Sequence, residues 1–265
     1  MTRSLLEATI DLAKVTGRVA LDHYKRHARG ERLDVEMKKD GSPVSAADRA
    51  SEQAARDFIH RHFPQDGILG EELGEERPEA PRRWCIDPID GTKSFLAGTP
   101  LWGSLVALVE GQEVLAGAAY FPVTDELVAA APGSGCVTAG APAGVSTIAD
   151  IAQSVVLTTD ERFLDSRHCL EPWRTLENQA RIARTWGDCF GYYLVATGRA
   201  ELMTDGILSP WDAACFLPII EEAGGVFTDW DGKRTAFGRG VIATNRVLAG
   251  DLRRALSVPF SEASR

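Results

Sequence analysis

The segment Trp84–Thr92 constrains the fold and chemistry of this chain more than any other stretch. It reads Trp-Cys-Ile-Asp-Pro-Ile-Asp-Gly-Thr, so an apolar run is followed by two aspartates three residues apart. Pro88 fixes its own φ angle and keeps Asp87 out of helical geometry, which predicts that a buried strand ends at Asp87. The turn that follows can direct both carboxylates and the carbonyl of Ile89 to one point, and the first N–H groups of a helix beginning near Gly91 face it too. Such a convergence is typical of a site for a metal-bound phosphate, although an Asp-Pro turn that only caps a helix is the alternative.

Three further acids are expected to reach this point from distant parts of the chain. Glu71 follows a predicted strand in Gly-Glu-Glu, Asp48 lies in the first turn of a helix opened by Ser45, and Asp212 follows Pro-Trp at another helix start. Carboxylates gathered in this way repel one another unless cations lie between them, and oxygen ligands favour Mg²⁺ or Mn²⁺ over Zn²⁺. Each acid alone also has an ordinary interpretation, a solvated carboxylate for Glu71 and a helix-stabilising first-turn acid for Asp48 and Asp212.

Composition limits the class of protein. A chain of 265 residues suits one large α/β domain or two fused halves. The net charge of −9 argues against nucleic acid or an acidic membrane as partner, and no apolar stretch approaches the roughly 20 residues of a membrane span. The first residues lack the layout of a signal peptide, so we expect a cytoplasmic protein. The five scattered cysteines contain no CxxC pair and are expected to be buried free thiols.

The order of helical and strand patterns indicates a layered α/β or α+β domain. A glycine-, alanine- and proline-rich stretch at 133–143 suggests a seam between an N-terminal half, 1–135, and a C-terminal half, 136–265. An acidic loop is expected at 72–81. Helices are predicted at 4–27, 45–62, 189–197, 211–223 and 248–256, and strands at 68–69, 83–86, 101–109, 114–121, 126–131, 154–158, 181–185, 200–203, 226–228 and 241–243.

Together these motifs resemble the inositol monophosphatase superfamily of magnesium-dependent phosphomonoesterases. The resemblance rests on Pro43–Asp48, Gly70–Glu72, the Asp-Pro-Ile-Asp-Gly-Thr segment and Trp211–Ala214, and it extends over essentially the whole chain. It implies an αβαβα sandwich of the inositol monophosphatase and fructose-1,6-bisphosphatase type, assembled as a homodimer that binds two or three Mg²⁺ ions, with Mn²⁺ as a possible substitute.

The resemblance also implies roles for single residues. Glu71, Asp87 and the Ile89 carbonyl would hold the first ion, Asp87, Asp90 and Asp212 the second, and Glu71 would assist a third. The implied catalytic residues are Asp48, Thr92 and Glu71: Thr92, hydrogen-bonded to Asp48, would orient or deprotonate a metal-activated water for in-line attack on phosphorus. The N–H groups of Gly91 and Thr92 would hold the phosphate oxygens. Lys38 lies in the loop that is mobile near the metals of such enzymes, and Lys39 is the alternative.

The second half resembles the histidinol-phosphate phosphatase branch of the superfamily, through Arg184–Tyr192 and the segments that follow. Histidinol phosphate carries an ammonium group and an imidazole, so a carboxylate at Asp188, together with Asp205, would complement it and suit an uncharged ring of hydroxyls poorly. Arg184 is a further candidate for the substrate pocket. Asp188 has a helix N-cap as its alternative role, and Asp205 could equally bind inositol hydroxyls.

The sequence therefore predicts a Mg²⁺-dependent phosphomonoesterase that hydrolyses L-histidinol phosphate in histidine biosynthesis. An inositol-1-monophosphatase or a broad sugar-phosphate phosphatase is the alternative. A catalytically silent binding or regulatory protein is the remote one, which the presence of every motif acid disfavours.

Overall fold

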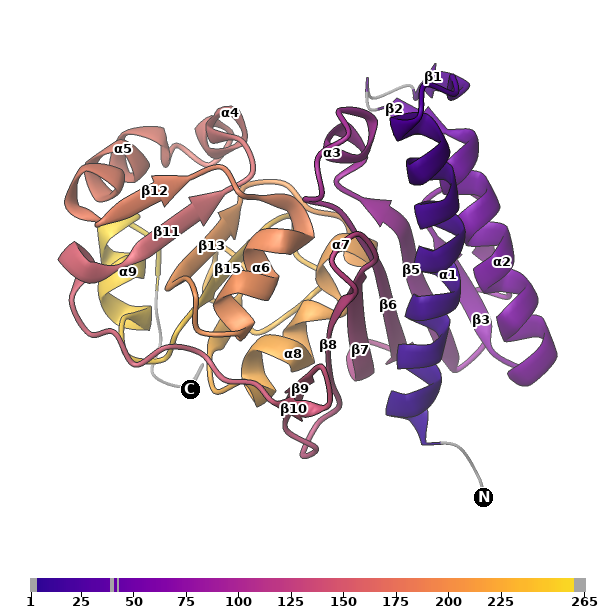
Figure 1. Cartoon of the computed structure of the whole chain (residues 1–265). Coiled ribbons are helices and arrows are strands. Elements are labelled where there is room, and N and C mark those ends of the chain that lie inside the picture. The colour runs from indigo at the N-terminus through magenta and orange to yellow at the C-terminus, as the bar shows by residue number, and fades with distance from the viewer. Residues whose placement is uncertain (1–3, 39–40, 42, 260–265) are drawn as a thin grey trace.

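The computed structural model describes residues 4–38, 41 and 43–259. The chain folds into five alternating layers of helices and sheets (Figure 1). Helices α1 and α2 cover one face of an eight-stranded sheet, and α6 and α8 fill the space between it and a five-stranded sheet. The outer face of the smaller sheet packs against α5 and α9. The predicted αβαβα sandwich is thereby confirmed. The helices are α1 Leu5–Ala28, α2 Ala46–His62, α3 Thr92–Leu96, η1 Ile151–Gln153, α4 Glu161–Asp165, α5 Leu170–Gln179, α6 Asp188–Ala196, α7 Pro210–Ala213, α8 Phe216–Glu222 and α9 Ala249–Ala255.

The larger sheet has the strand order β10-β9-β8-β7-β6-β5-β3-β4 and is antiparallel except for the β3–β5 pair. In the smaller sheet, ordered β12-β11-β13-β15-β14, strand β11 runs parallel to both of its neighbours. Strands β1 and β2 form a separate antiparallel ribbon. The strands are β1 Val35–Met37, β2 Pro43–Ser45, β3 Gly67–Gly70, β4 Gly74–Glu76, β5 Arg82–Asp90, β6 Gly103–Glu110, β7 Glu113–Phe121, β8 Glu126–Ala130, β9 Cys136–Thr138, β10 Ala141–Pro142, β11 Val155–Thr158, β12 Ile182–Arg184, β13 Leu202–Asp205, β14 Val226–Thr228 and β15 Val241–Thr244.

Local sequence explains how the two long helices begin and pack. Ser4 opens α1 with a capping box, and Ser45 opens α2 with another, as predicted from its spacing to Asp48.

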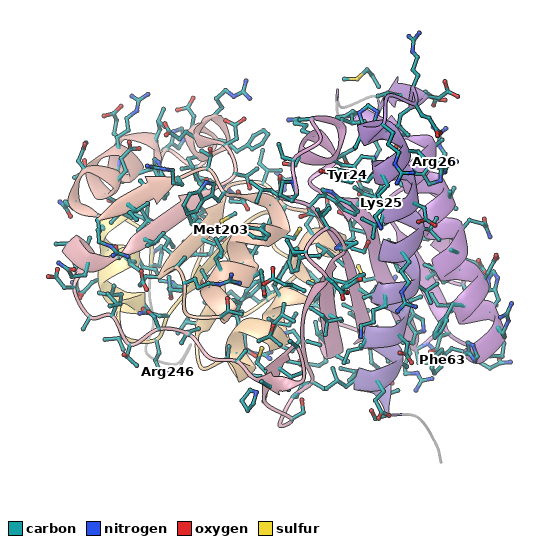
Figure 2. The ribbon with its side chains drawn as sticks, in the orientation of Figure 1. Tyr24, Lys25, Arg26, Phe63, Met203 and Arg246 are labelled. Atoms are coloured by element: carbon teal, nitrogen blue, oxygen red, sulfur yellow. The ribbon has the colours of Figure 1, made fainter. Side chains whose placement is uncertain are left out.

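Helix α1 lies close against the sheet because Gly17 has no side chain: a Cβ there would be 2.6 Å from the ring of Tyr120. Tyr24 lies near the C-terminal end of α1 (Figure 2). Its hydroxyl donates a 2.6 Å hydrogen bond to the carbonyl of Gly98, just beyond α3.

Three predicted elements differ from the observed ones. Part of the expected 72–81 loop is strand β4, because Gly74, at φ +73°, lets the chain reverse and pair with β3. The single helix expected at 211–223 is divided into α7 and α8, because Pro218 has no N–H to continue the ladder from α7. Strand β5 also does not end at Asp87 but continues to Asp90.

The glycine-rich stretch expected to separate two halves carries strands β9 and β10, which extend the larger sheet at its edge. The division of the chain into 1–135 and 136–265 stays a prediction.

The buried thiols are confirmed, because Cys85, Cys136, Cys169, Cys189 and Cys215 are all buried and free. Within residues 4–38, 41 and 43–259, no helix combines the length and the apolar character needed to cross a membrane.

Candidate active site

The candidate site lies where strands of both sheets end and where helices α2, α6 and α7 begin. The parallel strands β3 and β5 bring Glu71 and the Asp87–Asp90 segment to one edge of the larger sheet. Strands β11 and β13, also parallel, bring Thr159 and Asp205 to the facing edge of the smaller sheet. One pocket, of about 230 Å³, is lined by residues from both edges. The site therefore depends on the two sheets being packed together.

A β-bulge explains how both aspartates of β5 face the same way. Residues three apart in a regular strand point to opposite faces. Here Asp87 pairs with Leu105 while Asp90 pairs with Gly103, so three steps along β5 correspond to two along β6. The extra residue rotates Asp90 back toward the face of Asp87. Pro88, which cannot donate to the ladder, lies in the bulge, and its carbonyl accepts a 2.7 Å hydrogen bond from Ser104.

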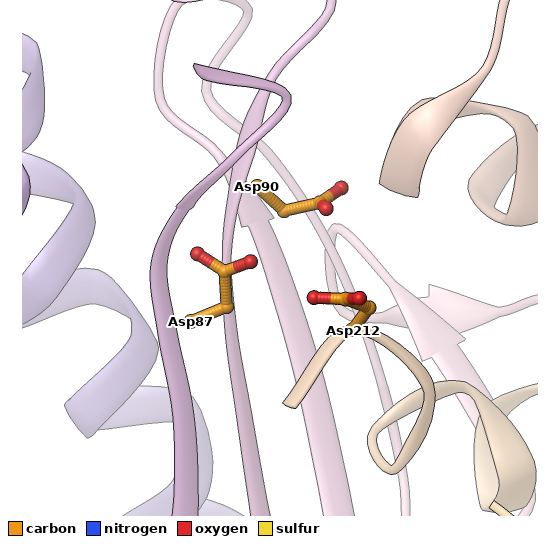
Figure 3. A group of neighbouring side chains, drawn as sticks. All are labelled: Asp87, Asp90 and Asp212. Carbon is orange, nitrogen blue, oxygen red and sulfur yellow. The ribbon is translucent and has the colours of Figure 1, made fainter. Parts of the chain in front are cut away.

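Asp87, Asp90 and Asp212 form a group, the aspartate trio, in which one carboxylate oxygen of each residue lies within 4.8 Å of the others (Figure 3). Backbone groups orient all three. Asp87 accepts from the Ile89 N–H at 2.9 Å, Asp212 from the Ser209 N–H at 2.8 Å and Asp90 from the Cys189 N–H at the start of α6. These oxygens can hold a divalent cation.

The electrostatics of the trio favour a cation. Burial, followed by the charges of Glu71 and Asp90, raises the pKa of Asp87 well above its usual value. Burial, followed by the charges of Asp188 and Asp212, does the same for the pKa of Asp90. Burial also raises the pKa of Asp212 to about 7. A bound divalent ion would counter these shifts, since its charge offsets the repulsion between the carboxylates and favours their ionised form.

Glu71 lies beside the trio rather than within it. Its Oε1 atom is 2.7 Å from the ammonium group of Lys38, which is also 2.7 Å from Glu72. Burial alone would lower the pKa of Lys38, but the hydrogen bonds to both glutamates outweigh it and the pKa is raised. The predicted loop lysine thus reaches the metal-ligand region. Its alternative, Lys39, lies outside the described residues.

The predicted hydrogen bond between Thr92 and Asp48 is wrong. The Thr92 hydroxyl donates to the carbonyl of Ile89 at 3.1 Å, and Asp48 Oδ2 accepts from the N–H and hydroxyl of Ser45 at 2.8 and 2.6 Å. Asp48 is therefore held by the capping box that opens α2 and not by Thr92. Its other oxygen, Oδ1, is buried and has no partner in the described part of the chain. Burial raises the pKa of Asp48, and the charge of Glu71 adds to the shift.

A second pocket, of about 340 Å³, adjoins the first and shares Gly91, Thr92 and Asp188 with it. Asp188 begins α6, where its N–H donates to the Thr159 hydroxyl at 2.7 Å. Burial and then the charge of Asp205 raise the pKa of Asp188 to about 7, while Lys93 opposes the shift. The second pocket thus contains two acidic side chains, Asp160 and Asp188, and two basic ones, Lys93 and Arg162.

The other two predicted substrate residues, Asp205 and Arg184, differ from Asp188 in where they lie. Asp205 is buried, with Oδ1 accepting from the Thr159 N–H at 3.0 Å and Oδ2 from the Tyr192 hydroxyl at 2.9 Å. It contributes to the wall of the first pocket. Arg184 is exposed at the end of β12, lines neither of these two pockets and donates to the carbonyl of Ala183. No contact therefore favours its predicted role.

Sequence reasoning missed Thr159 and Lys93. Thr159 lines both pockets and fixes Asp188 and Asp205, and the detectable signal was its position directly after a predicted strand. Lys93 follows Gly91-Thr92 and lines the second pocket. Its position in the first turn of α3 was the available signal.

Comparison with known proteins agrees with this geometry. Residues 1–258 match the profile of the inositol monophosphatase family. A histidinol-phosphatase of Chlorobaculum parvum is 42% identical over 93% of this chain and 94% of that protein. An inositol-1-monophosphatase of Mesorhizobium japonicum is 30% identical over 98% of this chain and 99% of that protein. The crystal structure of extragenic suppressor protein suhB from Bartonella henselae superposes with a TM-score of 0.88 at 28% identity, covering 96% of this chain and 98% of that one.

Proposed function

The chain belongs to the inositol monophosphatase family of phosphomonoester-hydrolysing phosphatases, and we propose that it cleaves L-histidinol phosphate to L-histidinol and phosphate with bound Mg²⁺. The observation that carries the choice of substrate is Asp188. Its carboxylate lies where the first pocket, which contains the aspartate trio, meets the second, outer pocket. Asp205 lies nearby. Carboxylates there complement a cationic alcohol, because a buried charge without a partner costs several kcal/mol. The similarity to a histidinol-phosphatase supports the same choice.

The metal-holding residues would be Asp87, Asp90 and Asp212, with Glu71 and the Ile89 carbonyl beside them. The all-oxygen donor set fits Mg²⁺ or Mn²⁺. When bound, these ions supply a nucleophile from water at neutral pH and offset the charge of the phosphate. Two or three ions per site remain the expectation, as do the homodimer and the cytoplasmic location.

The chain's own groups have separable tasks in this reaction. Asp48 lines neither of the two pockets, but its Oδ1 atom, which is buried and has no hydrogen-bond partner among the described residues, is the proposed acceptor of a proton from water. The hydroxyl of Thr92 donates to the Ile89 carbonyl, so its lone pairs can accept a hydrogen bond from that water and orient it. The N–H groups of Gly91 and Thr92, at the start of α3, would hold phosphate oxygens.

Phosphate release from histidinol phosphate and from inositol 1-phosphate tests the proposal directly. With Mg²⁺ we expect kcat/KM to be higher for histidinol phosphate, and an excess of chelator should abolish release from both. A higher kcat/KM for inositol 1-phosphate would overturn the proposed substrate. Undiminished release under chelation would overturn the metal requirement.

Asp188→Asn tests the selectivity argument. The variant keeps a residue that tolerates the left-handed backbone at this position, where φ is +49°, but removes the charge. We expect kcat/KM for histidinol phosphate to fall about tenfold to a hundredfold, because a charge-assisted contact with the substrate is lost. The value for inositol 1-phosphate should change little.

Asp160→Asn is the matched control for this variant. Asp160 also lines the outer pocket, but its charge is already paired with Arg162. Removing the charge of Asp160 should leave the ratio of kcat/KM for histidinol phosphate to that for inositol 1-phosphate near the wild-type value. Equal ratios in the Asp188 variant and the wild type would contradict the assignment.

A further inference from the structure

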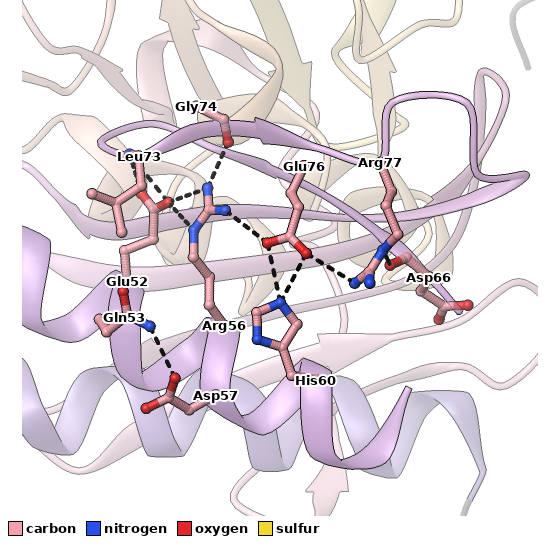
Figure 4. Close-up of polar contacts among 10 residues, drawn as sticks. All are labelled: Glu52, Gln53, Arg56, Asp57, His60, Asp66, Leu73, Gly74, Glu76 and Arg77. Atoms are coloured by element: carbon pink, nitrogen blue, oxygen red, sulfur yellow. Dashed lines mark hydrogen bonds and ion pairs between the residues drawn. The ribbon is translucent and has the colours of Figure 1, made fainter. Parts of the chain in front are cut away.

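Glu52, on helix α2, is a fully buried carboxylate that accepts hydrogen bonds from the turn containing Glu71 and Glu72. Its Oε2 atom accepts a 2.7 Å hydrogen bond from the N–H of Glu72. The N–H of Leu73 points at both of its oxygens, at 3.2 and 3.3 Å (Figure 4). On the preceding side, the N–H of Glu71 donates to the carbonyl of Ile86 at 3.1 Å. The backbone of Glu71 is thus held from both sides, by strand β5 and by Glu52.

Arg56, one helical turn after Glu52, binds both the Glu52 carboxylate and the same turn of the chain. Its Nε and Nη2 atoms donate to Glu52 Oε1 at 2.9 and 2.8 Å, and Nη2 also donates to the carbonyl of Gly74 at 2.6 Å. Nη1 contacts Glu76, whose carboxylate accepts from His60 at 2.9 Å. Helix α2 is thereby tied to both ends of the turn at 71–74 (Figure 4).

Gly70 shows how tightly the turn is fitted to this carboxylate. A Cβ at Gly70 would lie 2.0 Å from Glu52 Oε1, a distance that two such atoms cannot occupy. The glycine that precedes the two glutamates is therefore required by the side chain of Glu52. Nothing in the local sequence of Gly-Glu-Glu indicates this, because the cause lies 18 residues earlier in helix α2.

We propose that Glu52, held by Arg56, is a positioning residue that fixes Glu71 for divalent-metal binding, an inference that rests on the proposed function. All of the hydrogen bonds at Glu52 are received by its carboxylate oxygens, from backbone N–H groups and from a guanidinium. A glutamine at this position would have to turn its NH₂ group toward one of these donors. The charge and shape of Glu52 are therefore both needed to hold the turn.

Glu52→Gln tests the inference by direct titration with Mn²⁺, using the full-length chain and calorimetry. Loss of a residue that orients metal ligands costs about tenfold to a hundredfold in metal affinity, and we expect a rise in the Mn²⁺ Kd in that range. The Mg²⁺ concentration for half-maximal phosphate release should rise in parallel, with a smaller change in kcat at saturating Mg²⁺. In the metal-free protein, the N–H groups of Glu72 and Leu73 should exchange with solvent faster than in the wild type.

Asp66→Asn is the matched control, because Asp66 is also a buried acid, bonded to Arg82 and to Trp84 rather than to the turn. It should lower thermal stability without changing the Mn²⁺ Kd. Equal Mn²⁺ affinities for Glu52→Gln and Asp66→Asn would overturn the inference. If Glu52→Gln does not fold, Gly70→Ala displaces the same carboxylate, and an unchanged Kd in that variant would overturn it equally. A wild-type chain that binds no Mn²⁺ would instead refute the proposed metal site.

Discussion

Asp90→Asn is expected to reduce phosphate release at saturating Mg²⁺ by roughly a thousandfold. Metal ions stabilise the charge of a phosphoryl transition state by several kcal/mol, and about 4 kcal/mol corresponds to a factor of a thousand. An asparagine oxygen can still accept the hydrogen bond from the Cys189 N–H, so the backbone around the site should be retained. What is lost is one negative charge of the aspartate trio. Steady-state kinetics, with metal content measured on the same samples, gives the answer.

The same variant should stabilise the metal-free protein, which separates a lost ligand from a damaged fold. Burial, followed by the charges of Asp188 and Asp212, raises the pKa of Asp90, so a neutral amide in place of its carboxylate relieves the folded state of a buried charge among like charges. We expect a higher Tm than the wild type in chelator and a smaller rise in Tm when Mg²⁺ is added. Asp57→Asn, on an exposed face of α2, should change neither quantity. Near-normal turnover of Asp90→Asn would rule out the trio as the metal site.

Gly117→Ala is expected to destabilise the fold by about 3 kcal/mol. Gly117 lies in β7, under the corner between α7 and α8, and a Cβ there would be 2.2 Å from the carbonyl oxygen of Cys215. This contact is with backbone, so the helix corner must move. Overpacking of this kind costs 1–3 kcal/mol or more, and at this chain length about 3 kcal/mol lowers Tm by roughly 10 °C. Activity should fall as well, because Asp212 lies in α7, three residues before the displaced carbonyl.

Gly144→Ala provides the comparison for this prediction. A Cβ at Gly144 would lie 3.6 Å from the carbonyl oxygen of Ala223, which is an ordinary contact distance. Thermal unfolding should therefore show little change for Gly144→Ala and a large decrease for Gly117→Ala. Equal Tm values for the two variants would mean that the α7–α8 corner adjusts to the added methyl group without cost.

Much of the site could be predicted from the sequence because its ligands lie in short segments with strong local signals. Asp87 and Asp90 follow an apolar run, and Asp212 follows a proline at a helix start, so each could be placed at the end of an element. The resemblance then supplied their common location, which the structure reproduces for the trio.

Features that depend on pairing between distant residues were not predictable in this way. The bulge in β5 is defined by its register with β6, and the chain around Asp87 gives no count of the residues opposite. The hydrogen bond expected between the distant residues Thr92 and Asp48 does not form, because the Thr92 hydroxyl donates to its near neighbour Ile89. Glu52 looked like any acid on an amphipathic helix, since only the folded chain brings it to the turn after β3.

The placement of the trio has a consequence for how long the folded enzyme survives. Two of its members belong to the larger sheet, whereas the third is carried by the helical layer between the sheets, and Asp90 is also bonded to the start of α6. An ion held by all three acts as a non-covalent cross-link across this junction and has its full affinity only for the assembled chain. Separation of the layers would then also have to break the contacts to the ion, so the native state would live longer at high metal occupancy than the apolar core alone would allow.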